Sequence, residues 1–265
     1  MESQTKVKKA EAANNARYVG NIKYHGHSRV LLLTPVAPAA ELEGPFRLEG
    51  QEFLCSSTIV DAIHCSGAPK SIKDLREATE AAPFVVEKVK WAEQQGYDVV
   101  IINCMLDPGL KEAKAAVNIP VVGIREATTA VAFLIGSNPA YIYPEDIAVL
   151  DLNNDPERTY SELLKIGRKK IVNQGADILI PNCAYLGGLA DRLQSELGVP
   201  VIPNRDIALK MGELVATFRL RKELDWVDTT RSRGKMLLSN LYRLPIVGPP
   251  IYGVANLVKK AIAST

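Results

Sequence analysis

Two stretches of the sequence, QGYDVVIINCMLDPGL at residues 95–110 and QGADILIPNCAYLGGL at residues 174–189, follow one pattern. In each, Gln-Gly-x-Asp precedes a short apolar run that ends in Asn-Cys, and Gly-Leu follows the cysteine at the same distance. Every shared position is displaced by the 79 residues that separate Cys104 from Cys183. Chance alignment of so many residue types at one offset is improbable, so the repeat predicts two related halves, each with a strand that ends at a cysteine.

Short apolar runs alternate with helical patterns on both sides of these stretches. Buried strands are predicted at residues 30–33, 57–63, 97–102, 120–124, 147–152, 176–180 and 199–202. Helices are predicted at residues 71–94, 110–117, 126–135, 157–173, 188–197 and 206–220. Such alternation is typical of α/β proteins with parallel sheets. The predicted fold is two pseudo-symmetric parallel-sheet α/β domains with an active site in the cleft between them.

The predicted first domain combines residues 29–124 with 206–228, and the second covers residues 125–205. Residues 1–28 are polar and predict a flexible N-terminal tail. Residues 229–265 form a basic extension that has no Asp or Glu and carries interleaved apolar residues. We interpret this extension as an arm that packs on a neighbouring subunit of a homo-oligomer, since prolines interrupt any long amphipathic helix. The alternative is a contact with an anionic membrane surface.

Composition excludes several classes of protein. The net charge of +2 over 265 residues is too small to indicate nucleic-acid binding. The sequence has no apolar run of transmembrane length and no secretory pattern at its start, so we expect a cytoplasmic protein. With three histidines, four cysteines and no C-x-x-C motif, the sequence predicts that there is no metal site. It also has no nucleotide-binding motif, so we expect no cofactor. Cys55 and Cys65 have no repeat counterpart and are predicted to be structural.

The two repeated cysteines, Cys104 and Cys183, each fall at the predicted carboxyl end of a strand, where parallel α/β sheets bind ligands. Asp107-Pro108 suits a helix start, and a helix N-terminus lowers the pKa of a nearby thiol. One thiolate could remove a proton from a carbon next to a carbonyl while the other thiol protonates the opposite face. Backbone N–H groups at the helix starts would stabilise the enolate. The alternative is that both cysteines only pack in the core.

Residues beside the cysteines and after the first strand complete the candidate site. The predicted contacts to a small-molecule substrate are Thr34, Asn103, Met105, Asn182, Ala184 and Tyr185. Alternatives stay open for three kinds of residue among them: the threonine suits a turn before Pro35, the asparagines could bond only to backbone, and the tyrosine could pack in the core.

The first cysteine motif also resembles a known family. NCMLDPGL at residues 103–110 and PVVGIREA at residues 120–127 resemble the hydantoin racemase branch of the aspartate/glutamate/hydantoin racemases. Asn182-Cys183-Ala184 is similar to the family's second motif, and GAPKSI at residues 67–72 is similar to its Gly-Pro-x-Ser-Ile segment. The resemblance covers about residues 29–228. It implies a cofactor-independent racemase or epimerase for an amino acid, a hydantoin or a similar small carbonyl compound, with Cys104 and Cys183 as the acid/base pair.

The residues that would surround the substrate depart from the family pattern. TPVA at residues 34–37 stands where Asn-Pro-Asn is usual, and NCAYL at residues 182–186 replaces Gly-Cys-Ala-Gly-Met. A maleate isomerase-like or arylmalonate decarboxylase-like enzyme on the same fold therefore remains an alternative, as does a non-catalytic binding or scaffold protein. A decarboxylase of this family needs one cysteine, so retention of two favours the racemase.

Overall fold

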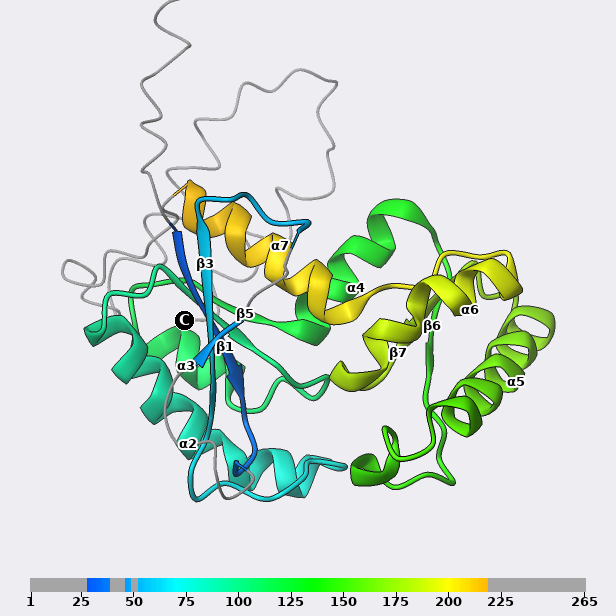
Figure 1. Ribbon diagram of the computed structural model, residues 1–265, viewed down its shortest axis with the longest axis horizontal. Helices are drawn as coiled ribbons and strands as arrows, with labels where there is room; N and C mark the ends of the chain where they lie inside the picture. Colours follow the sequence, from blue (N-terminus) through cyan, green and yellow to red (C-terminus); the bar gives the residue numbers. More distant parts are fainter. Residues whose placement is uncertain (1–27, 39–45, 49–51, 219–265) are drawn as a thin grey trace, which may run out of the picture. The chain divides into compact units, whose positions relative to one another are not determined.

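The computed structural model describes residues 28–38, 46–48 and 52–218, drawn in colour in Figure 1. The predicted N-terminal tail, except for Ser28, and the basic extension lie outside these residues. Five strands form the larger sheet in the order β2-β3-β1-β4-β5, which confirms the predicted α/β class. They are β1 (Ser28–Thr34), β2 (Phe46–Arg47), β3 (Thr58–His64), β4 (Val99–Ile102) and β5 (Val121–Gly123). All neighbours pair in parallel except β2, which runs antiparallel to β3.

Alternate residues of the central strands of this sheet pack on opposite layers. Leu31 and Leu33 of β1 join the cluster that includes Val85 and Val89 of α2 (Leu75–Gln94), on the same side as α3 (Leu110–Ala116). Val30 and Leu32 join the cluster of the opposite face, which includes α7 (Asn204–Thr217). A parallel strand covered on both faces reads as a continuous apolar run, which explains why its sequence signal is strong.

The smaller sheet consists of β6 (Pro139–Ile142) and β7 (Ile178–Pro181), paired in parallel. The predicted strand at residues 199–202 is reduced to one bridge between Leu179 and Val201. Around this sheet lie α4 (Ile124–Ile135), α5 (Pro156–Gln174) and α6 (Ala190–Leu197), with the 3-10 helices η1 (Val149–Asp151) and η2 (Ala184–Leu189). Helices α4 and α7 pack against each other (Figure 1). None of the helices in the part of the chain that is described could cross a membrane.

The predicted strand at residues 147–152 is wrong, and β6 lies upstream of it. Within the run, Ile147 and Leu152 are buried but Leu150 is 65% exposed, so the backbone turns into η1 instead of extending. Of the β6 residues only Ile142 is buried. Its apolar signal is therefore weak, and pairing with β7 rather than local pattern makes this segment a strand.

Hydrogen bonds confirm that the two halves repeat one backbone design. The N–H groups of Asn103 and Asn182 both donate to a carbonyl of the neighbouring strand, β1 or β6, at 2.8 Å. The carboxylates of Asp98 and Asp177 both accept a backbone N–H at the start of that neighbour, at 2.9 and 2.8 Å respectively. The repeated Asp and Asn thus fasten the two ends of the strand that leads to each cysteine.

Candidate active site

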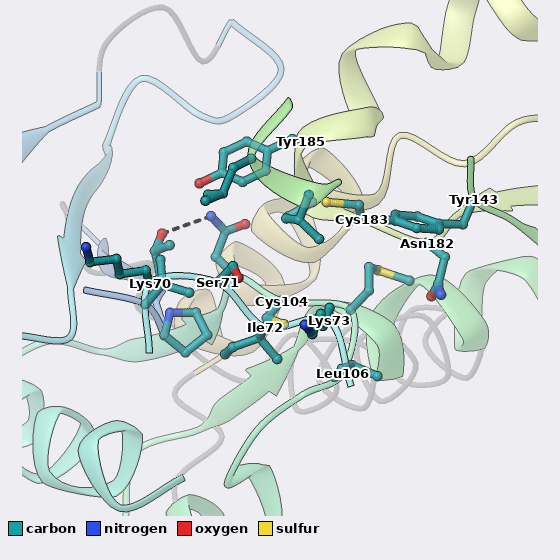
Figure 2. A pocket seen from close by; sticks show the side chains of 18 residues that line it. Lys70, Ser71, Ile72, Lys73, Cys104, Leu106, Tyr143, Asn182, Cys183 and Tyr185 are labelled. Carbon is teal, nitrogen blue, oxygen red and sulfur yellow. Dashed lines mark hydrogen bonds between the residues drawn. The ribbon is translucent and has the colours of Figure 1, made fainter. Parts of the chain in front are cut away.

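The carboxyl ends of β1, β4 and β7 border a cavity of about 160 Å³ (Figure 2). The structure brings together every residue that the sequence placed in the site. Those that line the cavity are Thr34, Asn103, Cys104, Met105, Asn182, Cys183, Ala184 and Tyr185. Cys55 is exposed elsewhere and Cys65 is buried in the core of the larger sheet.

The cavity wall also contains residues that were not among the predicted substrate contacts. They are Pro35, Val36, Lys70, Ser71, Ile72, Lys73, Leu106, Tyr143, Val149 and Leu150. The last three lie in the segment that follows β6, and the misplaced strand at residues 147–152 hid them. With β6 in its observed place, the rule that ligands bind after the carboxyl ends of parallel strands would have found this segment.

Both cysteines lie in the same local turn. The thiol of Cys104 accepts the N–H of Leu106, and the thiol of Cys183 accepts the N–H of Tyr185, two residues downstream in each case. The carbonyls of both cysteines also accept the N–H three residues downstream, at 3.0 Å in each half. The repeat therefore presents two sulfurs in equivalent backbone settings to one cavity.

Burial controls the ionisation of both thiols. It raises the pKa of Cys104 to about 12, more than the N–H of Leu106 and the charge of Arg125 lower it. Burial also raises the pKa of Cys183, and this effect exceeds the lowering by the N–H of Tyr185. The predicted net lowering by a helix N-terminus is wrong for both thiols. Helix α3 starts only at Leu110, well after Cys104, and although Cys183 is the N-cap of η2, burial raises its pKa more than the N–H of Tyr185 lowers it. Without a ligand, both groups are neutral thiols near pH 7.

Asp107 fastens the first cysteine loop, but not as the predicted cap of the next helix. The N-cap of α3 is Gly109, whereas the Asp107 carboxylate accepts the N–H groups of Arg125 and Glu126 at 3.1 and 2.9 Å. A Cβ on Gly123 would lie 2.3 Å from the Asp107 Cγ, so this approach requires glycine. Burial raises the pKa of Asp107 to about 6 despite these two hydrogen bonds. The loop is thereby tied to the first turn of α4.

The second cysteine loop is fastened from the opposite direction. Asn204, at the first turn of α7, is fully buried, and its Nδ2 donates to the carbonyls of Pro181 and Cys183 at 2.9 and 2.7 Å. A Cβ on Gly187 would lie 2.6 Å from the Asn204 Oδ1. The Asn204 amide on α7 thus ties down the loop of Cys183, as the Asp107 carboxylate ties the loop of Cys104 to α4.

Arg125 contacts both cysteine loops, and sequence analysis missed it. Its Nε donates to the Met105 carbonyl at 2.5 Å and its Nη2 to the Asn182 Oδ1 at 3.0 Å. The guanidinium carbon lies 4.6 Å from the centroid of the Tyr141 ring. The residue occupies the variable position of the Pro-Val-Val-Gly-Ile-x-Glu-Ala motif, so the motif itself gave no signal for it.

The charged groups of the cavity wall are cationic. Lys70 and Lys73 line it, and among the cavity residues in the described part of the chain there is no Asp or Glu. The ammonium group of Lys73 lies 3.7 Å from the Glu77 carboxylate. Thr34 and Asn103 are joined by a 3.0 Å hydrogen bond from Nδ2 to Oγ1. Within residues 28–38, 46–48 and 52–218, His, Cys, Asp and Glu form no group of three that could hold a metal ion.

Comparison with known proteins agrees with this geometry. Residues 51–142 match the model of the Asp/Glu/hydantoin racemase family. A hydantoin racemase of Rhizobium meliloti is 31% identical over 182 residues, covering 59% of this chain and 76% of that protein. A hydantoin racemase of Pseudomonas sp. (strain NS671) is 28% identical over 186 residues, covering 60% of this chain and 75% of that protein.

A solved structure shares the fold. Allantoin racemase from Klebsiella pneumoniae superposes with a TM-score of 0.64 at 22% sequence identity, covering 73% of this chain and 89% of that one. The sequence relatives and this shared fold agree with the repeated cysteine motif. The chain therefore belongs to the Asp/Glu/hydantoin racemase family, a family of isomerases.

Proposed function

We propose that the protein is a cofactor-independent racemase or epimerase that inverts a carbon next to a carbonyl by proton transfer between two cysteines. The observation that carries this proposal is the pair of thiols of Cys104 and Cys183. They come from opposite halves of a repeat, lie in the same turn and line one cavity of about 160 Å³. Groups related in this way can address opposite faces of one small molecule.

The reaction begins with one cysteine as a thiolate and the other as a thiol. The thiolate takes the proton of the substrate carbon, and the electron pair of the C–H bond moves onto the neighbouring carbonyl as an enolate. The thiol then protonates the carbon from the other face and becomes a thiolate. The enzyme ends with its proton on the opposite sulfur, which is the form that acts on the other enantiomer.

The enolate oxygen needs hydrogen-bond donors. The sequence analysis assigned this role to backbone N–H groups that follow each cysteine. Two of them, the N–H groups of Leu106 and Tyr185, already donate to the sulfurs and are less available to an enolate oxygen. The other donors in the cavity wall include the amide of Asn182 and, on the segment of residues 70–73, the hydroxyl of Ser71 and the ammonium groups of Lys70 and Lys73. We assign the stabilisation of the enolate to this side of the cavity.

The pH dependence follows from the buried thiols. The active form carries one thiolate, and burial raises the pKa of both cysteines, of Cys104 to about 12. The fraction of active enzyme therefore grows as the pH rises. We expect kcat/KM to increase close to tenfold per pH unit between about pH 7 and 8, because burial raises the pKa of both thiols above their ordinary value and the pH there lies below both.

The charges and apolar groups of the wall favour a neutral cyclic substrate over a free amino acid. An α-ammonium group would find no carboxylate among the described lining residues, whereas a hydantoin carries no such charge. Ile72, Leu106, Val149 and Leu150 offer apolar surface to a substituent. We therefore propose hydantoins, the compounds after which the two relatives above are named, as the first class to test, in forms that carry a substituent at carbon 5.

The test follows inversion and isotope exchange together. Enantiopure hydantoins with apolar 5-substituents and the matching free amino acids are incubated with the protein in D₂O. Polarimetry measures inversion, and mass spectrometry measures deuterium at the reacting carbon. We expect inversion of the hydantoins with one deuterium per inverted molecule, above the rate with the Cys104→Ala/Cys183→Ala double variant. No exchange above that control for any compound would overturn the proposal.

We also propose that the protein is a homo-oligomer of the cytoplasm. Working thiols require a reducing compartment, which supports the location. Phe133, Leu134 and Ile135 at the end of α4 are 61%, 80% and 57% exposed, which supports contact with a second copy. Sedimentation at a mass above the 28.9 kDa of one chain is the expected result, and a monomer would contradict it.

A further inference from the structure

We infer that Arg125 is a positioning residue that sets the register of the two cysteine loops across the halves of the molecule. The inference rests on the proposed function and goes beyond it, because it assigns the alignment of the two thiols to one side chain outside the cavity wall. A guanidinium has a planar, fixed set of N–H donors. Two groups bound to one guanidinium are therefore held at a fixed separation.

The two groups that Arg125 binds are the immediate neighbours of the cysteines. Met105, whose carbonyl accepts from Nε at 2.5 Å, follows Cys104 in the chain. Asn182, whose Oδ1 accepts from Nη2 at 3.0 Å, precedes Cys183. A shift of the guanidinium thus moves one cysteine loop relative to the other.

Arg125 is itself held by its backbone and by an aromatic ring. Its backbone N–H donates to the Asp107 carboxylate at 3.1 Å, and its guanidinium lies over the Tyr141 ring. The hydroxyl of Tyr141 in turn lies 2.7 Å from the Thr129 Oγ1, one turn along α4. Packing on a ring and a fixed backbone restrict the rotamers of the arginine, so its two hydrogen bonds act as a rigid bridge.

The repeat offers an arginine that does not make this bridge. Arg205 follows Arg125 by 80 residues, the displacement that relates Pro200 to Pro120. Arg205 is exposed, and its Nε lies 3.8 Å from the Asp206 carboxylate. The Oδ1 of Asn103, the repeat counterpart of Asn182, has no hydrogen-bond partner in the described structure. The alignment of the loops therefore depends on Arg125, and Arg205 provides a matched control.

Inversion and exchange place different demands on this alignment. Exchange of the substrate hydrogen on one face needs one correctly placed thiol, whereas inversion needs both thiols in line with one carbon. A displacement of about 1 Å in a catalytic group costs on the order of 100-fold in rate. Loss of the bridge should therefore slow inversion much more than exchange, a split that a general loss of stability does not produce.

The experiment compares Arg125→Met, Arg125→Lys and Arg205→Met in D₂O with each enantiomer of a hydantoin that the wild type inverts. We expect Arg125→Met to lose inversion by about 100-fold and exchange by less than about tenfold. Arg125→Lys keeps the charge but cannot span both acceptors, so it should fall between Arg125→Met and the wild type. Arg205→Met should stay within about threefold of the wild type. Equal losses of inversion and exchange in Arg125→Met, or the same split in Arg205→Met, would overturn the inference.

Two further measurements separate this inference from the proposed function and from misfolding. If the wild type exchanges the hydrogen of no hydantoin, the proposed function fails. If the wild type inverts a hydantoin and Arg125→Met loses inversion and exchange equally, only the bridge is contradicted. If Arg125→Met does not fold, Asn182→Ala removes the other end of the bridge and must give the same split.

Discussion

The two halves of the molecule build the same cysteine turn and fasten it by opposite means. In the first half the Asp107 carboxylate extends from the loop to two N–H groups of α4. In the second, the Asn204 amide extends from α7 back to two carbonyls of the loop. The first arrangement places an ionisable acid and Arg125 beside Cys104, while the second is neutral. The two thiols are thus equivalent in backbone geometry but differ in the charges around them. In the proposed reaction they exchange the roles of base and acid in spite of this difference.

Replacing the cysteines one at a time tests this comparison with the largest expected effect. We expect Cys104→Ala and Cys183→Ala each to lose inversion by about 1,000-fold, because general acid–base groups contribute 10²–10⁴-fold. Each variant should keep exchange of the substrate hydrogen in D₂O, Cys104→Ala with one enantiomer and Cys183→Ala with the other. NMR of the recovered substrate measures this exchange. Exchange of the same enantiomer by both variants would show that the halves do not address opposite faces.

Alkylation sharpens the electrostatic side of the comparison. Because burial raises the pKa of Cys104 and Cys183, iodoacetamide at pH 8 should modify both more slowly than the exposed Cys55, by about 100-fold or more for Cys104. This order is the reverse of what a thiol activated by a helix N-terminus would give. Peptide mass spectrometry measures each rate, and substrate should slow the two cavity thiols further. Cys104 alkylation as fast as that of Cys55 would refute the effect of burial.

The two tethers should differ in their contribution to stability. Asn204→Ala removes two side-chain hydrogen bonds to the loop of Cys183, one of them buried, and should lower the free energy of unfolding by about 2–3 kcal/mol. Asp107→Ala removes a cap-like acceptor from α4 and should cost about 1–2 kcal/mol. Urea unfolding measures both, with Asn154→Ala as a control because the Asn154 amide makes one exposed hydrogen bond. A larger loss for Asp107→Ala than for Asn204→Ala would reverse the comparison.

The smallest expected effect is the pH dependence of the first tether. The pKa of Asp107 is raised to about 6, above about 3.9 for an unfolded Asp, so the folded state binds this proton more tightly. This tighter proton binding stabilises the folded state fully below about pH 4, and the stabilisation is lost as the pH rises through the folded-state pKa of about 6. Between pH 4 and 7, the free energy of unfolding of the wild type should therefore fall by about 1–2 kcal/mol relative to that of Asp107→Asn, as measured by urea unfolding. A relative gain of the wild type over this range would contradict the assignment.

Local sequence signals predicted most of the fold because they describe backbone states that depend on few neighbours. Gly96 and Gly175, which occupy the same position of the repeat, adopt similar φ values of 75° and 63° at the ends of α2 and α5. The buried strands β1, β4 and β7 read as apolar runs because both of their faces are covered. The segment of β6 escaped detection because only Ile142 of its four residues is buried, and the apolar residues 147–152 led to the prediction of a strand there instead.

The sequence alone determined the repeat, the strand that precedes each cysteine and the neighbours of each cysteine that border the cavity, because these follow from motifs and spacing along the chain. Only the tertiary structure decided that Asp107 serves α4 and that Asn204 serves the loop of Cys183. It also decided that one arginine joins both loops and that burial raises the pKa of both thiols. The physical reason is that tethers and pKa values depend on burial and on partners from 18 to 57 residues away in the chain, which no local pattern records.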